Sequence, residues 1–372
     1  MKDNEKDNKM NSIQLSVLDI ENKYKLDYAD DAANSNTWCR WGTDNNLPML
    51  YRTCYNQSST LKSIIDGTIN YVLGDKIEIS DEASFWKNEV NRTGMTMREF
   101  IEAIAFNLLV YNGFAYQVIY NKLLIPVEFY PLDFGRCRTN EHQTKIYYSK
   151  KWSKYQSKYD EYDVWNPDNI NPENPTQIFY YKNRKSQNIY PTPPYNGAVY
   201  DILTEIECSK YSLNTVARGF SAKHIINFPE NANLTDEQKK GIEDAIKNKF
   251  CGSENESNFM LYWMNNAGEK IQIDKVESDD SPERFIAIKD NARQNVFVAM
   301  RAMPTLFGLP NATNGFSTDE FKDSYKLYQK TVIEPIQDII VESIGKTMGI
   351  DKPIHIQKFD IDFDRDKDKE AV

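Results

Sequence analysis

Apolar residues recur every three or four positions in several segments of the chain, which is the period of an amphipathic helix. These segments are residues 59–73, 100–111, 196–219, 282–303 and 318–350. Pro335 lies inside the last segment and removes a backbone N–H from it, so we expect that helix to be kinked. The pattern therefore predicts a chain rich in long helices.

Residues at the ends of these segments support the helix predictions. In a capping box, a Ser or Thr is followed three residues later by Glu or Gln, and each side chain bonds a free backbone N–H. Such boxes begin at Thr96, Thr235 and Ser317. Gly113 and Gly219 are suited to end the helices that precede them.

Short runs of β-branched, aromatic and apolar residues predict strands between the helices. The runs cover residues 115–120, 123–130, 223–228, 259–264, 270–276 and 354–359. Asn121-Lys122 separates the first two runs and favours a hairpin there. Residues 135–194 are rich in Tyr, Lys, Asn and Pro, and they predict further strands joined by long loops. Together these elements predict an α+β fold.

The composition indicates a folded protein that is acidic overall. The chain has 372 residues, of which 40% are hydrophobic and 13% aromatic, and its formal net charge is −10. A protein that holds DNA tightly usually carries a basic surplus, so any contact with nucleic acid is expected to be local and weak. The 23 tyrosines combine a large ring with a polar tip, which suits surfaces between subunits.

The cysteines and the apolar runs indicate the kind of cellular compartment in which the protein is expected. The five cysteines are odd in number and none are in CxxC spacing, which argues against a disulfide framework or a zinc site and favours a reducing compartment. No segment has 18 uncharged apolar residues in a row, and Met1–Met10 are charged. We therefore predict neither a membrane span nor a signal peptide.

Catalytic motifs are missing or incomplete in the sequence. His142, His224 and His355 lie far apart, and none stands in an HExxH motif. The tripeptide Gly345-Lys346-Thr347 is similar to the end of a phosphate-binding loop, but Ile340 occupies the position where that motif needs its first glycine. We therefore predict no catalytic residue, no metal site and no cofactor.

Alternating aspartates near the C-terminus are open to two interpretations. The residues from Asp360 to Asp368 have the spacing of calcium ligands, but Arg365 and Ala371 stand where a calcium loop needs Gly and Glu. A solvated, self-repelling tail is the favoured interpretation.

A basic and aromatic segment is also ambiguous. Four lysines alternate there with three rings, as in a platform for single-stranded nucleic acid, and the set is Lys150, Lys151, Trp152, Lys154, Tyr155, Lys158 and Tyr159. Asp160, Glu161 and Asp163 follow directly. Because these acids oppose nucleic acid, a solvated hairpin face or a subunit contact is favoured.

Three stretches, in this order, resemble the portal proteins of tailed bacteriophages. The first is WGTDNNLP at Trp41–Pro48, followed by a helix, and it is similar to the family's "WG.DN..P" motif. The second is the succession of long helix, small α+β module and long helix over residues 195–303. The third is MPTLFGLP at Met303–Pro310, then FSTDE at Phe316–Glu320 and a long helix containing Ile333-Glu334-Pro335-Ile336. Little follows that helix, so the family's C-terminal crown is expected to be short or missing.

The resemblance implies a portal fold: a mixed α/β wing, long stem helices, a small α+β clip and a long kinked C-terminal helix. The implied boundaries are residues 1–194 for the wing with a loose tail at 1–12, 195–220 and 281–304 for the stem helices, 221–280 for the clip, 305–317 for the tunnel loop, 318–350 for the long helix, and 351–372 for a short strand and a charged tail.

The resemblance also implies a function without enzymatic activity. Portal subunits form a ring, usually of twelve, at one capsid vertex, and double-stranded DNA is packaged and ejected through it. The implied partners are further copies of the chain, the terminase large subunit, the major capsid and scaffolding proteins, a tail or neck adaptor and, transiently and without sequence specificity, DNA. The implied location is the virion, after assembly in the bacterial host cytoplasm.

Candidate site residues are carried over from the family by position. The tunnel loop, the expected narrowest point, would present Leu309, Pro310, Asn311, Thr313 and Asn314. Lys289, Arg293 and Arg301 are candidate cations on the second stem helix, spaced so that they guide DNA without holding it. The candidates for terminase or adaptor contact in the clip are Asp236, Glu237, Glu254 and Glu256. Ordinary intersubunit ion pairs and a plain surface loop are the alternatives for the first two sets.

Two other classes of function remain open. A different head–tail structural protein, such as an adaptor or collar subunit, predicts a ring without a clip-like module. A metal-dependent nucleic-acid enzyme predicts activity that requires a divalent cation. That class would need clustered carboxylates or a nucleotide loop.

Overall fold

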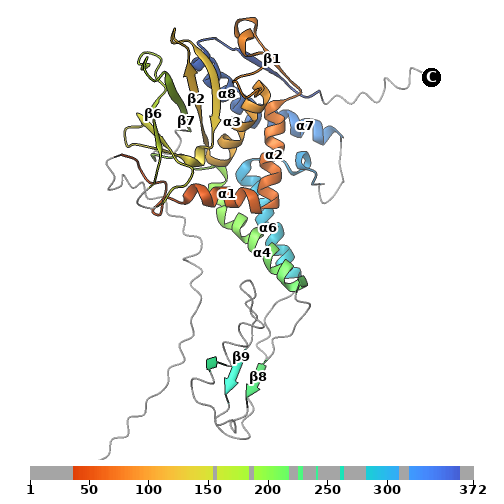
Figure 1. Cartoon of the computed structure of the whole chain (residues 1–372). Helices are drawn as coiled ribbons and strands as arrows, with labels where there is room; N and C mark the ends of the chain where they lie inside the picture. The colour runs from red at the N-terminus through yellow and green to blue at the C-terminus, as the bar shows by residue number, and fades with distance from the viewer. Residues whose placement is uncertain are drawn as a thin grey trace, which may run out of the picture. The chain divides into compact units, whose positions relative to one another are not determined.

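The computed structural model describes residues 37–153, 157–183, 188–217, 225–228, 240–241, 260–263, 282–309 and 318–360. The chain divides into two compact units (Figure 1). Unit 1 comprises Met1–Gly197 and Ala299–Val372, and unit 2 comprises Ala198–Val298. Both helices and strands occur in each unit, so the α+β expectation holds at the level of a mixed α/β fold.

The helices of unit 1 follow the periodicity of the sequence closely. They are α1 (Leu47–Gln57), α2 (Ser59–Leu73), α3 (Met97–Tyr111), α7 (Thr318–Tyr328) and α8 (Glu334–Met348). The capping box of α3 is confirmed, because the Thr96 side chain accepts from the Glu99 N–H while the Glu99 carboxylate accepts from the Thr96 N–H at 2.8 Å. Asn112, with a left-handed φ of +63°, ends this helix.

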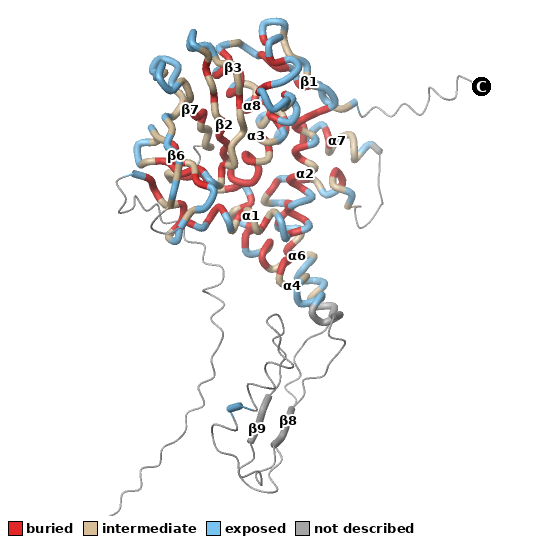
Figure 2. The backbone as a smooth tube through the Cα atoms, viewed as in Figure 1, coloured by how far each residue is buried: buried red, intermediate tan, exposed pale blue. Residues whose placement is uncertain are grey.

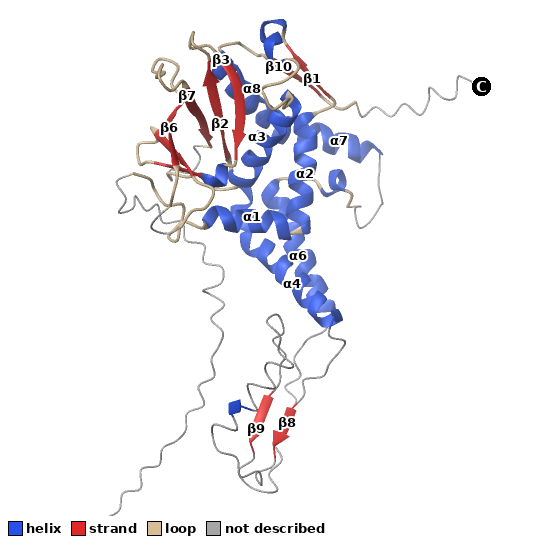
Figure 3. Ribbon diagram, viewed as in Figure 1, coloured by secondary structure: helices blue, strands red, loops and turns tan. Residues whose placement is uncertain are grey.

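A six-stranded sheet forms the other half of unit 1 (Figure 3). Its strands are β2 (Gly113–Tyr120), β3 (Pro126–Leu132), β4 (Cys137–Thr139), β5 (Lys145–Tyr148), β6 (Asp160–Val164) and β7 (Thr176–Lys182). The spatial order is β3-β2-β7-β6-β5-β4, and only β6 and β7 run parallel. The Tyr116 hydroxyl donates from β2 to the Ser343 carbonyl of α8 at 2.9 Å, which ties this helix to the sheet.

The β2–β3 hairpin corrects one strand prediction. Leu123, Leu124 and Ile125 were expected at the start of the second strand, but they form the turn, and β3 begins at Pro126. The Asn121 side chain accepts from the Leu123 N–H at 2.8 Å and from the Ile125 N–H at 3.1 Å. An Asn side chain that bonds the following backbone in this way competes with the strand ladder.

A second correction concerns the long helix near the C-terminus. The expected kink at Pro335 takes the form of a π-helical turn, Gln329–Ile333, inserted between α7 and α8. Pro335 follows directly in the first turn of α8, where it has no N–H to donate. The irregular turn therefore lies where the proline interrupts the helical hydrogen bonds.

Segments far apart in the sequence meet at the edge of unit 1. Strand β1 (Lys76–Ile79) pairs antiparallel with β10 (Ile354–Gln357), and the first of these was not predicted. Single helical turns of 3₁₀ type complete the unit, and they are η2 (Asp81–Trp86), η3 (Phe134–Arg136), η4 (Pro194–Ala198, at the border with unit 2) and η5 (Pro304–Phe307). The pairing of β1 with β10 joins the N-terminal and C-terminal parts of this unit.

The core of unit 1 contains a buried charge beside the WGTDNNLP stretch. Arg138 on β4 is 2% exposed, and its guanidinium donates to Asn45 Oδ1, to the Asn45 carbonyl, and to the carbonyls of Gly135 and Cys137. Asn45 has a φ of +60°, and its side chain also accepts from the Trp41 N–H at 3.1 Å. The stretch is therefore folded around a guanidinium from a distant strand.

Unit 2 contains a helical hairpin and a small strand pair. Helix α4 (Val199–Ala217) and helix α6 (Pro282–Met300, whose last two residues belong to unit 1) run antiparallel. Asp201 Oδ1 accepts from Asn295 Nδ2 at 2.8 Å, and the rings of Tyr211 and Phe285 stack at 4.8 Å. Strands β8 (Ile225–Phe228) and β9 (Met260–Trp263) pair in parallel.

Burial in this hairpin is uneven along its length (Figure 2). The start of α4 and the end of α6 are buried, whereas Tyr211, Leu213 and Ile286 at the other end are exposed. Along α6, Ala292, Val296 and Phe297 are buried, whereas Ile288 is 39% exposed.

Candidate nucleic-acid interface

Two of the three candidate channel cations lie one turn apart on α6. The Lys289 side chain is exposed and forms no ion pair within the described part of the chain. Arg293 is half-buried and pairs with Asp290 of the same helix. Arg301 is exposed and follows the last residue of α6 with a left-handed φ of +53°. The pairing neutralises Arg293 within its own helix, whereas Lys289 and Arg301 have no ion pair with any residue that the structure describes.

The candidate tunnel loop is described only at its first residue. Leu309 is half-buried, and its N–H donates to the Pro304 carbonyl at 3.1 Å. Gly308 before it has a φ of +79°, a conformation that favours glycine. The other candidates of this loop, Pro310, Asn311, Thr313 and Asn314, lie outside the described residues, as do the clip candidates Asp236, Glu237, Glu254 and Glu256.

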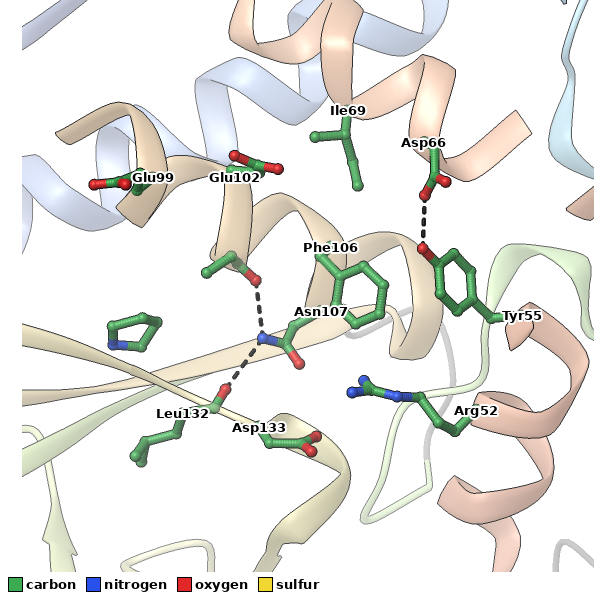
Figure 4. A pocket seen from close by; sticks show the side chains of 12 residues that line it. Arg52, Tyr55, Asp66, Ile69, Glu99, Glu102, Phe106, Asn107, Leu132 and Asp133 are labelled. Carbon is green, nitrogen blue, oxygen red and sulfur yellow. Dashed lines mark hydrogen bonds between the residues drawn. The ribbon is translucent and has the colours of Figure 1, made fainter. Parts of the chain in front are cut away.

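A polar pocket of about 410 Å³ opens in unit 1 between α1, α2, α3 and the end of β3 (Figure 4). Four carboxylates line it, and Arg52 lies over the Phe106 ring at 5.0 Å. Tyr55 donates to Asp66 Oδ1 at 2.7 Å, and Lys62 donates to both groups. No histidine or cysteine is among the twelve lining residues.

Two polar side chains of this pocket, Tyr55 and Asn107, are held by neighbouring groups. Partial burial and the Asp66 carboxylate raise the pKa of Tyr55, although Lys62 opposes the shift. The phenol therefore stays protonated at neutral pH and is not available as a base. The Asn107 amide is also fully engaged, since it donates to the Ala103 and Leu132 carbonyls and accepts from the Phe134 N–H.

Three of the four described cysteines are buried, and Cys208 is half-buried. Cys39, Cys54 and Cys137 are buried, and burial raises the pKa of Cys54 to about 12, which keeps it a thiol. The described part of the chain contains no group of three His, Cys, Asp or Glu residues that could hold a metal ion. Among the described helices, none is long and apolar enough to cross a membrane.

Sequence reasoning missed the role of Arg138. Burial lowers the pKa of its guanidinium to about 10, which leaves it charged at neutral pH. The charge lies 5.6 Å from the Trp41 ring and 5.0 Å from the Trp152 ring. No sequence signal marks it, because a buried arginine and a surface arginine in a short strand have the same local pattern.

Comparison with protein families decides the class of the chain. Residues 73–368 match the family model described as "Phage portal protein". The chain belongs to the phage portal protein family. The matched residues include the whole six-stranded sheet, all of unit 2 and the long helix interrupted before Pro335. A search of curated protein sequences finds no match to this portal-family chain.

Solved structures share the fold of this phage portal protein. The neck of the native GTA particle computed with C12 symmetry is 14% identical, with a TM-score of 0.54 over 87% of this chain and 86% of the other. The neck of the empty GTA particle computed with C6 symmetry is 13% identical, with the same TM-score over 87% of each chain. The virion of the native gene transfer agent is 14% identical, with a TM-score of 0.52 over 87% and 85%.

Proposed function

We propose that this chain forms the ring at the portal vertex of a phage capsid, through which the terminase packages double-stranded DNA and through which the DNA later leaves. The observation that carries the proposal is the family match over residues 73–368. The fold similarity to particle necks computed with C12 and C6 symmetry supports a ring of identical subunits. Such a ring uses one surface of each subunit against a different surface of the next.

The portal regions follow from this assignment. Unit 1 supplies the wing, α4 and α6 are the stem helices, and residues 221–280 form the clip, with the tunnel loop at 305–317. The acidic clip residues Asp236, Glu237, Glu254 and Glu256 contact the terminase and later the tail or neck adaptor. The wing faces the capsid and scaffolding proteins, and the ring assembles in the host cytoplasm.

Exposed apolar side chains in unit 2 support an interface between subunits. Tyr200, Leu213 and Val298 are 64%, 68% and 76% exposed. Large apolar side chains that gather on a two-helix unit are stabilised when another surface covers them. We assign this cover to the helices of the neighbouring subunits.

The electrostatics support a channel that passes DNA without holding it. Each fixed cation that neutralises a phosphate adds affinity and so resists movement. The net charge is −10, and Arg293 is neutralised by Asp290. Lys289 and Arg301 are then the channel cations, and the loop from Leu309 to Asn314 is the narrowest point.

Electron microscopy of the purified full-length chain, combined with light scattering for its mass, tests the proposal. Rings with a central hole wide enough for duplex DNA are expected. The variant Val298→Glu should reduce ring formation, because it places a charge in the apolar contact. Gln294→Glu, one turn earlier on α6, adds the same charge at a polar position and should leave rings intact. A monomer or a compact dimer at every concentration tested would contradict the proposal.

A further inference from the structure

The loop between β5 and β6 carries three unpaired lysines on unit 1. Lys150, Lys151 and Lys158 are exposed, and their ammonium groups form no ion pair within the described part of the chain. Lys154 lies outside the described residues and takes no part in the argument. In a chain with a net charge of −10, three free cations within nine residues form an isolated basic patch.

The backbone of this loop brings the lysines together. Strands β5 and β6 pair with Tyr148 opposite Asp160, so the loop closes a hairpin. The Ser149 hydroxyl oxygen lies 3.0 Å from the Lys151 carbonyl oxygen and 2.6 Å from that of Lys158. One buried serine therefore holds two lysines, seven positions apart in sequence, at the same end of the hairpin.

The acidic residues after the loop do not cancel this patch. Lys145 on β5 bonds Glu161 at 2.8 Å and Asp163 at 3.1 Å, so both carboxylates already have a cation. Asp160 is offset from them by one residue along β6, and alternation directs it to the opposite face of the strand. Lys145, outside the loop, thus shares its one positive charge between two of the three acids, and the third, Asp160, lies on the other face of β6.

Two of the three aromatic rings of the loop have partners within the protein, whereas Tyr155 lies outside the described residues. Trp152 Nε1 donates to the Arg136 carbonyl at 2.7 Å, and the indole contacts Trp38 at 4.8 Å. Tyr159 stacks on the same indole at 6.2 Å with 16° between the planes, and the Arg138 guanidinium lies 5.0 Å from it. Trp152 and Tyr159 are half-buried and already stack within the protein, which disfavours them as a platform for base stacking.

We propose that Lys150, Lys151 and Lys158 bind the phosphate backbone of double-stranded DNA, outside the channel and without base recognition. Phosphate contacts made by lysines position a duplex and carry no sequence information. A protein partner fits less well, because lysine is depleted at protein interfaces and hot spots are enriched in aromatic anchors, whereas Trp152 and Tyr159 are half-buried with partners in the chain. The Trp38–Trp152–Tyr159 cluster instead acts as a rigid base for the three cations.

Fluorescence anisotropy with a labelled duplex of mixed sequence, measured with the full-length chain over a series of salt concentrations, tests this proposal. The triple variant Lys150→Gln, Lys151→Gln, Lys158→Gln should weaken binding roughly tenfold or more at low salt and lower the salt slope by about 3. The matched control replaces three exposed lysines that each pair with a glutamate, namely Lys76, Lys330 and Lys346. It removes the same charge and should leave DNA binding unchanged.

Three results would overturn the proposal. Equal losses in the two triple variants would mean that only net charge matters. Tighter binding to single-stranded than to duplex DNA, with quenching of tryptophan emission, would show that the rings of the loop stack on bases. Loss of binding to polyglutamate, with duplex binding retained, would indicate an acidic protein partner.

The DNA test is separable from the ring proposal. Light scattering and electron microscopy of the triple variant should give the same rings as the unaltered chain, because these lysines are not part of the apolar contact in unit 2. A chain that forms no rings but still loses duplex binding in the variant would contradict the proposed function and leave the lysine site standing.

Discussion

The two units of the chain differ in how they place several of their tyrosines. In unit 1, tyrosines are buried and their hydroxyls donate to backbone carbonyls, as Tyr116 does to Ser343, Tyr190 to Cys39 and Tyr195 to Val110, at 2.6–2.9 Å. In unit 2, Tyr200 and Tyr211 are 64% and 48% exposed. These three core tyrosines of unit 1 thus have hydrogen-bond partners within the chain, whereas the two tyrosines of α4 keep much of their rings at the surface.

This difference corrects an expectation drawn from composition. The tyrosine content suggested surfaces between subunits, but in unit 1 many of the rings pack in the core. Burial raises the pKa of Tyr116, and the nearby Thr347 hydroxyl only partly offsets that effect. A polar tip at the end of a large ring suits a core equally well when a carbonyl is within reach, because the hydroxyl then keeps a partner.

The largest effect that would sharpen the comparison is expected at Arg138. Replacing it with Met leaves buried oxygens of Asn45, Gly135 and Cys137 without their donor, and we expect the free energy of unfolding to fall by about 3 kcal/mol. Chemical denaturation followed by tryptophan fluorescence measures this change. The control Arg92→Met removes an arginine whose side chain is 73% exposed and should change stability by no more than about 0.5 kcal/mol. Equal losses of unfolding free energy in the two variants would mean that the buried Arg138 guanidinium contributes no more to stability than the exposed Arg92.

A smaller effect is expected at the junction of the sheet with α8. Tyr116→Phe removes a buried hydroxyl that bonds the Ser343 carbonyl and the Thr347 side chain, and we expect a loss of about 1 kcal/mol. Thermal unfolding by calorimetry measures it. Tyr130→Phe serves as the control, because its hydroxyl bonds Glu128 nearer the surface and should matter less. If Tyr130→Phe lowered stability as much as Tyr116→Phe, burial would add nothing to the contribution of the Tyr116 hydroxyl.

The smallest effect is expected at the exposed contact between Asn295 and Asp201 in unit 2, and a buried position of α4 serves as the comparison. Asn295→Ala removes the exposed bond to Asp201 but gains helix propensity, so stability should change by no more than about 0.5 kcal/mol. Ile206→Ala, at a fully buried position of α4, should cost about 3 kcal/mol. Hydrogen exchange of the amides of α4 and α6 measures both changes. If the two variants were equally destabilised, the exposed polar contact would contribute as much as the apolar one.

The local elements of the fold could be predicted from the sequence. The apolar period gave α2 at its observed bounds, and Thr96 and Glu99 fixed the start of α3. These predictions succeed because a helix bonds residues four apart, so its pattern lies within a short window. The ordered motifs from Trp41 to the final long helix pointed to the family that the match over residues 73–368 shows.

Other features depended on residues far apart in the chain. In the sequence, Lys150 and Lys158 precede three acidic residues. Only the folded structure shows that two of these acids form ion pairs with Lys145. The sequence places Leu123 in an apolar run, and only the Asn121 contacts make that run a turn. The helical period of the sequence placed Lys289 and Arg293 on one helix. Only the side-chain positions show that Asp290 neutralises Arg293.

The sequence by itself determined where helices form, the absence of recognisable catalytic motifs and the family to which the chain belongs. The tertiary structure decided which charges form ion pairs, which aromatic rings are buried and which strand pairs with β1. The physical reason is distance: helix period and capping act within a few residues, whereas burial and ion pairing depend on which distant segments meet. Arg138 and Asn45, 93 positions apart, are joined by two hydrogen bonds that no local pattern encodes.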